Sequence, residues 1–230
     1  MRSRLVPILG LTLVGAAVLT AIVFIAVGEH GPAAPVDGAD TVQRLYGGIE
    51  QDANALGDPD APVTISVFND LQCTDCSAYF LETIPPLVEG QVRAGEARLE
   101  FRHRAIGLSV TTEAALAAAS AGLQDYEWEF IHLTYLNQEQ VEVSGTSDQF
   151  SGDFLERVAE AIPAPEFDVA QWEADRDSPE VEAHVESDDQ TAVDLGVASP
   201  AVVIAGPSGE ITLEQSPNAT EIEAAVSEAA

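Results

Sequence analysis

The chain has 230 residues, and a hydrophobic content of 46% is enough for one ordinary domain beside a targeting segment, which argues against a disordered chain. Beyond residue 28 it carries all 39 acidic residues but only seven arginines and no lysine, a formal charge of −32. Such a charge repels nucleic acid and anionic lipid, so neither is an expected partner, and a solvated acidic surface without a specific ligand explains it most simply.

The first predicted element is a membrane helix within residues 1–28. Residues 5–28 form an uncharged, almost wholly apolar run that follows Arg2 and Arg4. As a helix, this run reaches about 36 Å, against about 30 Å of bilayer hydrocarbon. A cleaved secretory signal is the alternative, because residues 26–28 resemble a processing site, although the run is longer than a usual signal core. Both interpretations predict export, and the anchor predicts a single-pass cell-membrane protein whose domain lies outside the cytoplasm.

Residues 29–55 are rich in Gly, Ala, Pro and Asp and are predicted to be a flexible linker. The domain is predicted over 56–230. Apolar and polar residues alternate over 63–68 and again over 97–102, which predicts two strands. Between them the sequence from Cys73 to about residue 88 is helix-compatible, although its two adjacent prolines are expected to kink or interrupt the helix.

Helical spacing or composition predicts further helices, and alternation predicts two more strands. The helices are expected over 112–122, 127–137, 153–162, 179–195 and 221–228. The strands are expected over 201–204 and 210–213, joined as a hairpin by the turn at 206–209. This order predicts an α/β domain, a small mixed sheet with a helical insertion at about residues 106–194.

Cys73 and Cys76 are the two cysteines of the chain, and they stand where the first predicted strand gives way to a helix. Unpaired N–H groups and the positive end of the helix dipole stabilise an anion there, so the Cys73 thiolate becomes accessible near neutral pH. Cys76 lies one turn further on, where it can resolve a mixed disulfide formed by Cys73. The spacing therefore favours thiol-disulfide exchange.

Three other interpretations of the pair remain open. A structural disulfide is compatible with export, although a bridge over two intervening residues removes little loop entropy. Metal binding normally requires two more ligands, and no second paired spacing is seen among the four histidines, His30, His103, His132 and His184, so no metal site is predicted. Coincidence is the third interpretation, since the pattern contains only two residues.

Several segments, taken in order, match one known pattern: residues 57–64, 68–76, 99–102, 126–139 and 195–202. They resemble parts of the DsbA-like branch of the thioredoxin superfamily. Residues 57–64 resemble its opening, 68–76 its active-site segment and 99–102 the strand that follows. Residues 126–139 resemble part of its inserted helical domain, and 195–202 resemble its cis-proline loop. The resemblance covers the chain from about Gly57 to its end. It implies a thioredoxin-like fold in which Cys73 and Cys76 are catalytic.

The resemblance further implies that Ser199-Pro200 is a cis peptide beside Cys73 and binds substrate. Proline removes an N–H, which leaves neighbouring main-chain groups free to pair with an extended substrate strand. An ordinary trans proline that opens a strand is the alternative.

Two positions depart from the family pattern. Val67 stands where many relatives carry a buried acidic residue thought to move protons. Either water or Asp70 takes that role here, or proton transfer is slower. Asp75, between the cysteines, places a carboxylate beside the forming thiolate and disfavours that anion. A less stable thiolate makes a weaker oxidant, so we expect a redox potential more reducing than that of the strongest oxidants of the family.

Together these patterns predict an extracytoplasmic thiol-disulfide oxidoreductase without a cofactor. Its expected partners are thiols or disulfides of exported proteins, an unidentified redox partner that resets the pair, and the membrane through the N-terminal helix. A non-catalytic, tethered thioredoxin-like module that binds a client or an assembly partner is the alternative.

Overall fold

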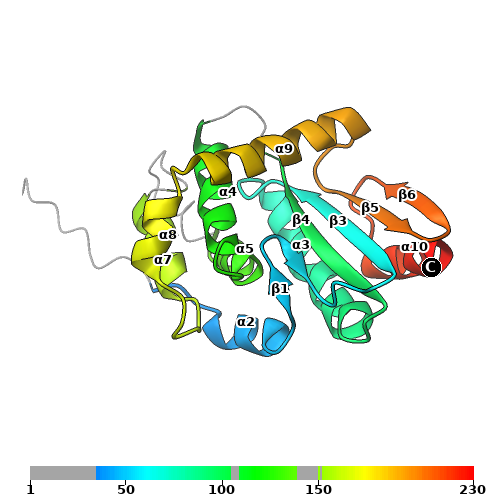
Figure 1. Ribbon diagram of the computed structural model, residues 1–230, viewed down its shortest axis with the longest axis horizontal. Coiled ribbons are helices and arrows are strands. Elements are labelled where there is room, and N and C mark those ends of the chain that lie inside the picture. Colours follow the sequence, from blue (N-terminus) through cyan, green and yellow to red (C-terminus); the bar gives the residue numbers. More distant parts are fainter. Residues whose placement is uncertain (1–34, 105–108, 139–149, 151) are drawn as a thin grey trace, which may run out of the picture. The chain divides into compact units, whose positions relative to one another are not determined.

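A six-stranded sheet organises the fold, with the strand order β1-β2-β4-β3-β5-β6 (Figure 1). The strands are β1 (Gln51–Asp52), β2 (Ala55–Leu56), β3 (Val63–Asn69), β4 (Ala97–His103), β5 (Ala201–Gly206) and β6 (Gly209–Leu213). Strands β3 and β4 run parallel, whereas the other neighbouring pairs are antiparallel. The four strands and the hairpin predicted from alternation are confirmed.

The computed structural model describes residues 35–104, 109–138, 150 and 152–230. The predicted membrane helix at residues 1–28 lies outside this part of the chain. Within the described part, no helix is both long enough and apolar enough to cross a bilayer. Residues 36–230 form one compact unit.

The helices of this unit are α2 (Ala39–Tyr46), α3 (Thr74–Leu87), the π-helical segment η1 (Val88–Val92), α4 (Ser109–Gly122), α5 (Glu127–Leu136), α7 (Gly152–Glu160), α8 (Val169–Asp175), α9 (Pro179–Leu195) and α10 (Ala219–Ala229). Helices α4 to α9 stand between β4 and β5 in the chain, where the sequence predicted a helical insertion.

The short helix α8 was not predicted. Its Trp172 is fully buried, and the Trp172 indole N–H donates to the Ala117 carbonyl of α4 (2.8 Å).

Side chains of β3 point alternately to the two faces of the sheet, and each face is covered by a different apolar cluster. Val63, Ile65 and Val67 are fully buried in the main core, together with residues of α3 and α10. Phe68 points to the opposite face and packs with Ala192 of α9 in a separate small cluster. Since successive side chains of a strand alternate between faces, this sequence needs cover on both sides, and α9 supplies it at the end of β3 that leads to Cys73.

The structure differs from the flexible linker expected over residues 29–55. Helix α2 and strands β1 and β2 lie within or at the end of that range, and β2 pairs with β4. Val42, Leu45 and Tyr46 are buried in the main core. Their spacing of three and four residues is that of an amphipathic helix, a signal that the Gly- and Pro-rich composition around it obscured.

The two prolines of α3 do not interrupt it. The helix continues through Pro85 and Pro86 to Leu87 and passes directly into η1. A proline removes the hydrogen bond to the carbonyl four residues before it. Those carbonyls belong to Leu81 and Glu82, which are half-buried and exposed, so water can reach that side of the helix. The departure from regular α-helix comes only after the prolines, where η1 forms a π-helical turn.

Candidate active site

The two cysteines form a disulfide at the point where β3 leads into α3, with their Cα atoms 5.1 Å apart. Cys73 is the N-cap residue of α3, in extended conformation, and its sulfur accepts a hydrogen bond from the Cys76 N–H (3.1 Å). The sulfur of Cys73 therefore lies at the positive end of the helix, in contact with one of the N–H groups that a helix leaves unpaired.

The two cysteines differ in exposure. Cys73 is half-buried, whereas Cys76 is fully buried. A partner protein can therefore reach Cys73 but not Cys76. This asymmetry, together with the helix N-terminus, is the arrangement that makes the first cysteine of such a pair the nucleophile and the second the internal one.

The Ser199-Pro200 peptide bond is cis, as the resemblance implied. It immediately precedes β5, whose Ala201 pairs with Phe68 of β3, so the loop lies at the same end of the sheet as the disulfide. The Ser199 hydroxyl oxygen lies 3.5 Å from the sulfur of Cys76. The loop is therefore in contact with the disulfide through the buried Cys76.

Asp70 is held close to the pair by its main chain. Its main-chain oxygen accepts from the Cys73 N–H (3.2 Å), and its carboxylate accepts from the Gln72 N–H (2.8 Å). Burial raises the pKa of Asp70 above its ordinary value, although the Gln72 N–H and the charge of Arg104 act in the opposite direction. Val67 is fully buried in the apolar core, so no carboxylate stands at the position that is acidic in many relatives.

A family model described as thioredoxin matches residues 50–220, most of the chain. The chain belongs to the thioredoxin family. A probable disulfide bond formation protein D of Bacillus cereus is 27% identical over 155 residues, which cover 66% of this chain and 69% of that protein.

Solved structures share the fold at lower identity. Oxidised BdbD from Bacillus subtilis superposes with a TM-score of 0.62 at 17% identity, over 77% of this chain and 92% of that one. A thioredoxin-like oxidoreductase from Silicibacter pomeroyi gives a TM-score of 0.61 at 24% identity, over 81% and 96%. With its Cys-X-X-Cys pair at the start of α3, the chain is a DsbA-like thiol-disulfide oxidoreductase of the thioredoxin superfamily.

In this thioredoxin-family domain, helix α5 and the residues just after it form hydrogen bonds with the main chain of the active-site segment. The Tyr135 hydroxyl donates to the main-chain oxygen of Asp70 (3.1 Å), and the Gln138 amide donates to that of Leu71 (3.3 Å). In return, the Ser77 hydroxyl donates to the Tyr135 carbonyl (3.2 Å). The sequence does not reveal this role of Tyr135, because a contact between residues more than sixty positions apart leaves no trace in local spacing.

Other side chains have structural roles. His132 is buried, and its Nδ1 lies 2.8 Å from the Tyr46 hydroxyl oxygen. Trp128 is fully buried. At the end of β4, His103 is 1% exposed, and the arginines on either side of it, Arg102 and Arg104, form ion pairs with α9.

Proposed function

We propose that this DsbA-like oxidoreductase exchanges disulfides with exported proteins outside the cytoplasm, with Cys73 as the attacking sulfur and Cys76 as the resolving sulfur. The observation that supports these roles most strongly is the difference in exposure at the start of α3. Cys73 is half-buried and its sulfur accepts a hydrogen bond from the Cys76 N–H, whereas Cys76 is fully buried.

The exchange conserves thiols and electrons. A client thiolate attacks the sulfur of Cys73, a client-Cys73 disulfide forms, and the Cys73-Cys76 bond breaks to leave the Cys76 thiolate. A second client thiolate then attacks the client sulfur of this mixed disulfide and releases Cys73 as a thiolate. The client gains one disulfide and loses two electrons, which the pair gains. To restore the pair, the Cys73 thiolate attacks a disulfide of an unidentified redox partner and releases one partner thiolate. The Cys76 thiolate then attacks the Cys73 sulfur of this mixed disulfide, which re-forms the Cys73-Cys76 bond and releases the second partner thiolate.

Ser199 and Pro200 are proposed to contribute to the client-binding surface. The loop is close to the pair, because the Ser199 hydroxyl is in contact with the Cys76 sulfur. When Cys76 becomes a thiolate, this hydroxyl can donate to it.

Residues 5–28 are proposed to form the membrane anchor, because they form a long apolar run preceded by two arginines.

Trapping of the mixed disulfide tests these roles. In Cys76→Ser the resolving sulfur is absent, so when the reduced variant meets client proteins that contain a disulfide, the Cys73 thiolate is expected to attack that disulfide, release one client thiolate and stay joined to the client. Non-reducing gels detect this adduct, and mass spectrometry locates it on Cys73. Cys73→Ser is the matched control, since it retains one cysteine and is expected to give no adduct. Client binding by Cys76→Ser with no covalent species would contradict catalysis and would favour a non-catalytic binding module.

A further inference from the structure

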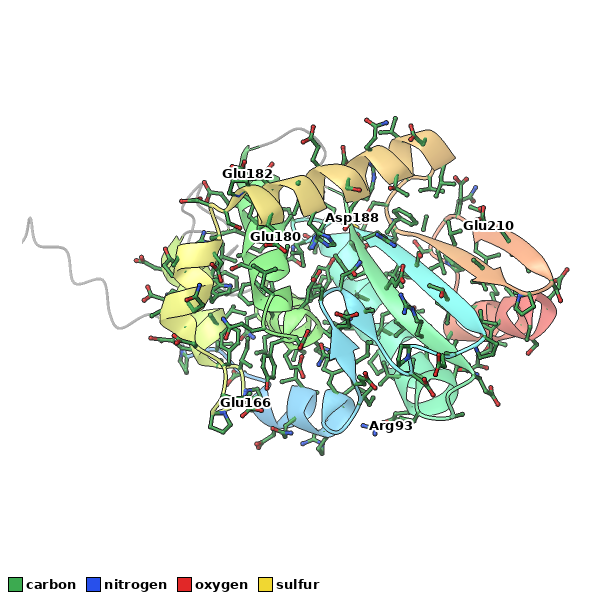
Figure 2. The ribbon with its side chains drawn as sticks, in the orientation of Figure 1. Arg93, Glu166, Glu180, Glu182, Asp188 and Glu210 are labelled. Atoms are coloured by element: carbon green, nitrogen blue, oxygen red, sulfur yellow. A yellow bond between two sulfur atoms is a disulfide. The ribbon has the colours of Figure 1, made fainter. Side chains whose placement is uncertain are left out.

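Two histidines and an aspartate meet where α9 passes the carboxyl end of β4. His184 and Asp188 stand one helical turn apart in α9, and His103 is the last residue of β4. One donor atom from each lies within 4.8 Å of the other two. Figure 2 labels Asp188, between α9 and the strand ends, and its side chain is 1% exposed. None of the three residues takes part in the exchange proposed for the cysteine pair.

The ring nitrogen Nε2 of His184 is shielded from solvent and has no hydrogen-bond partner in the described part of the chain. It lies 3.5 Å from Oδ2 of Asp188, beyond a good hydrogen bond. Buried polar atoms are nearly always paired, so an unpaired one calls for an explanation such as an ion. A metal ion between this nitrogen and the carboxylate would supply the missing partner to His184.

The other two side chains are already held in place. Glu127 approaches Nε2 of His103 at 2.9 Å, and both side chains are 1% exposed. A carboxylate on one ring nitrogen orients a histidine and makes the other nitrogen, here Nδ1, a better ligand. The Asp188 carboxylate accepts from Arg102 (2.9 Å) and from the His103 N–H (3.1 Å). Such outer contacts are typical of the groups that support metal ligands.

We infer that His103, His184 and Asp188 bind one divalent transition-metal ion of the zinc class. Two imidazoles and one carboxylate suit Zn²⁺, Co²⁺ or Ni²⁺, whereas Ca²⁺ and Mg²⁺ prefer oxygen ligands. Ligand bonds of about 2.1 Å keep two donor atoms no more than about 4.2 Å apart, so the cluster must close slightly around the ion. The side chain of His184 is 31% exposed, which gives it room to move.

The site would join α9 to the sheet close to the active centre. His103 pairs with Asn69 in the β3–β4 register, and the Asn69 amide donates to the main-chain oxygen of Cys76 (3.3 Å). The role inferred is binding, and it requires no redox step by the metal. Spacing in the sequence did not suggest it, because the two histidines come from elements far apart in the chain.

Titration of the full chain with Co²⁺ tests the inference. The cysteines are kept oxidised so that no thiolate competes, and excess Mg²⁺ occupies the acidic surface. We expect one Co²⁺ per chain, with visible d–d absorption that Zn²⁺ abolishes, and Zn²⁺ is expected to raise the melting temperature. His184→Ala is expected to weaken binding by about tenfold or more and to lose the stabilisation by Zn²⁺.

Glu186→Gln is the matched control. Glu186 is exposed, lies in α9 two residues from both His184 and Asp188, and carries one of the many surface charges. Its substitution is expected to leave Co²⁺ affinity within about twofold, because it removes a diffuse charge but no ligand. Equal affinity of wild type and His184→Ala, or absence of stoichiometric binding to wild type, would overturn the site. Equal weakening by both substitutions would overturn it too, because general attraction to an acidic surface would explain the binding.

Discussion

At the scale of single residues, the active site depends on where the fold places each sulfur. The Cys73-Cys76 spacing could be read from the sequence, and so could the start of the helix. The full burial of Cys76 and its contact with Ser199 could not, because they arise from the antiparallel pairing of β3 with β5. Asp70 was visible as a nearby acid, but the contacts of Tyr135 and Gln138 behind it depend on the packing of α5.

Buried His132 predicts a loss of stability in acid. Burial lowers the pKa of His132 to about 4, below the value of about 6.5 for an unfolded chain. The unfolded state therefore takes up a proton first, and this contribution to stability, complete above pH 6.5, is lost as the pH falls to 4. The difference corresponds to at most about 3 kcal/mol. His132→Gln is expected to show a smaller loss than wild type over this range in urea unfolding.

Comparison of the two proteins isolates the histidine from other groups. Burial raises the pKa of Glu129 to about 7, so that carboxyl acts in the opposite sense and favours the folded state at low pH. Both proteins contain it, and their difference removes it to first order. Parallel curves of unfolding free energy against pH for wild type and His132→Gln would contradict the assigned role of His132.

At the scale of elements, the C-terminal helix is docked by a close approach of backbones. The Ala229 carbonyl of α10 accepts from the Ser208 N–H (2.9 Å) in the turn between β5 and β6. A Cβ added to Gly206 would lie 2.4 Å from that carbonyl oxygen. Glycine at this position therefore lets the helix end meet the hairpin, an example of a strand glycine that marks close approach.

Gly206→Ala is expected to destabilise the protein by about 1–3 kcal/mol, because the added methyl group forces the end of α10 away from the hairpin. Gly90→Ala is the control: Gly90 lies in η1, and a Cβ there would meet nothing within 4 Å. Denaturant unfolding of both variants measures the difference. Equal stabilities of the two variants would show that the close approach at Gly206 has no energetic consequence.

The sequence predicted the strands and most helices because their apolar residues repeat at clear periods. It failed over residues 36–56, where short elements sit among Gly, Pro and Asp, and only the spacing of Val42, Leu45 and Tyr46 indicated a helix. It also did not indicate that His103 is buried. The residues that bury it, Glu127 and those of α9, are remote in sequence, so local pattern could not identify them.

At the scale of the whole molecule, negative charge dominates. The formal charge of −30 means that folding brings many carboxylates closer together, and their mutual repulsion opposes the compact state. The ion pairs of β4 offset only a few of these charges: Arg98 and Arg102 bind Glu100, and Arg102 and Arg104 bind acidic residues of α9. Stability should therefore depend on the ionic strength of the solution.

Unfolding free energy is expected to rise by on the order of 1 kcal/mol or more between 10 mM and 1 M NaCl, because the screening length falls from about 30 Å to about 3 Å. Thermal or urea unfolding across a salt series measures this. Sucrose at matched osmolality is the control, since it is excluded from protein surfaces but does not screen charge. A flat response to NaCl, or an equal response to both solutes, would contradict charge repulsion as the cause.

The proposed exchange requires Cys73 to be the sulfur that meets the client and Cys76 to be the one held inside. Alkylation of the reduced protein tests this directly, with a small iodoacetamide pulse at neutral pH and mass spectrometry of the two labelled cysteines. We predict that Cys73 is labelled at least about tenfold faster, because its thiolate is more stable and more exposed. Equal labelling of both cysteines, or faster labelling of Cys76, would contradict the account.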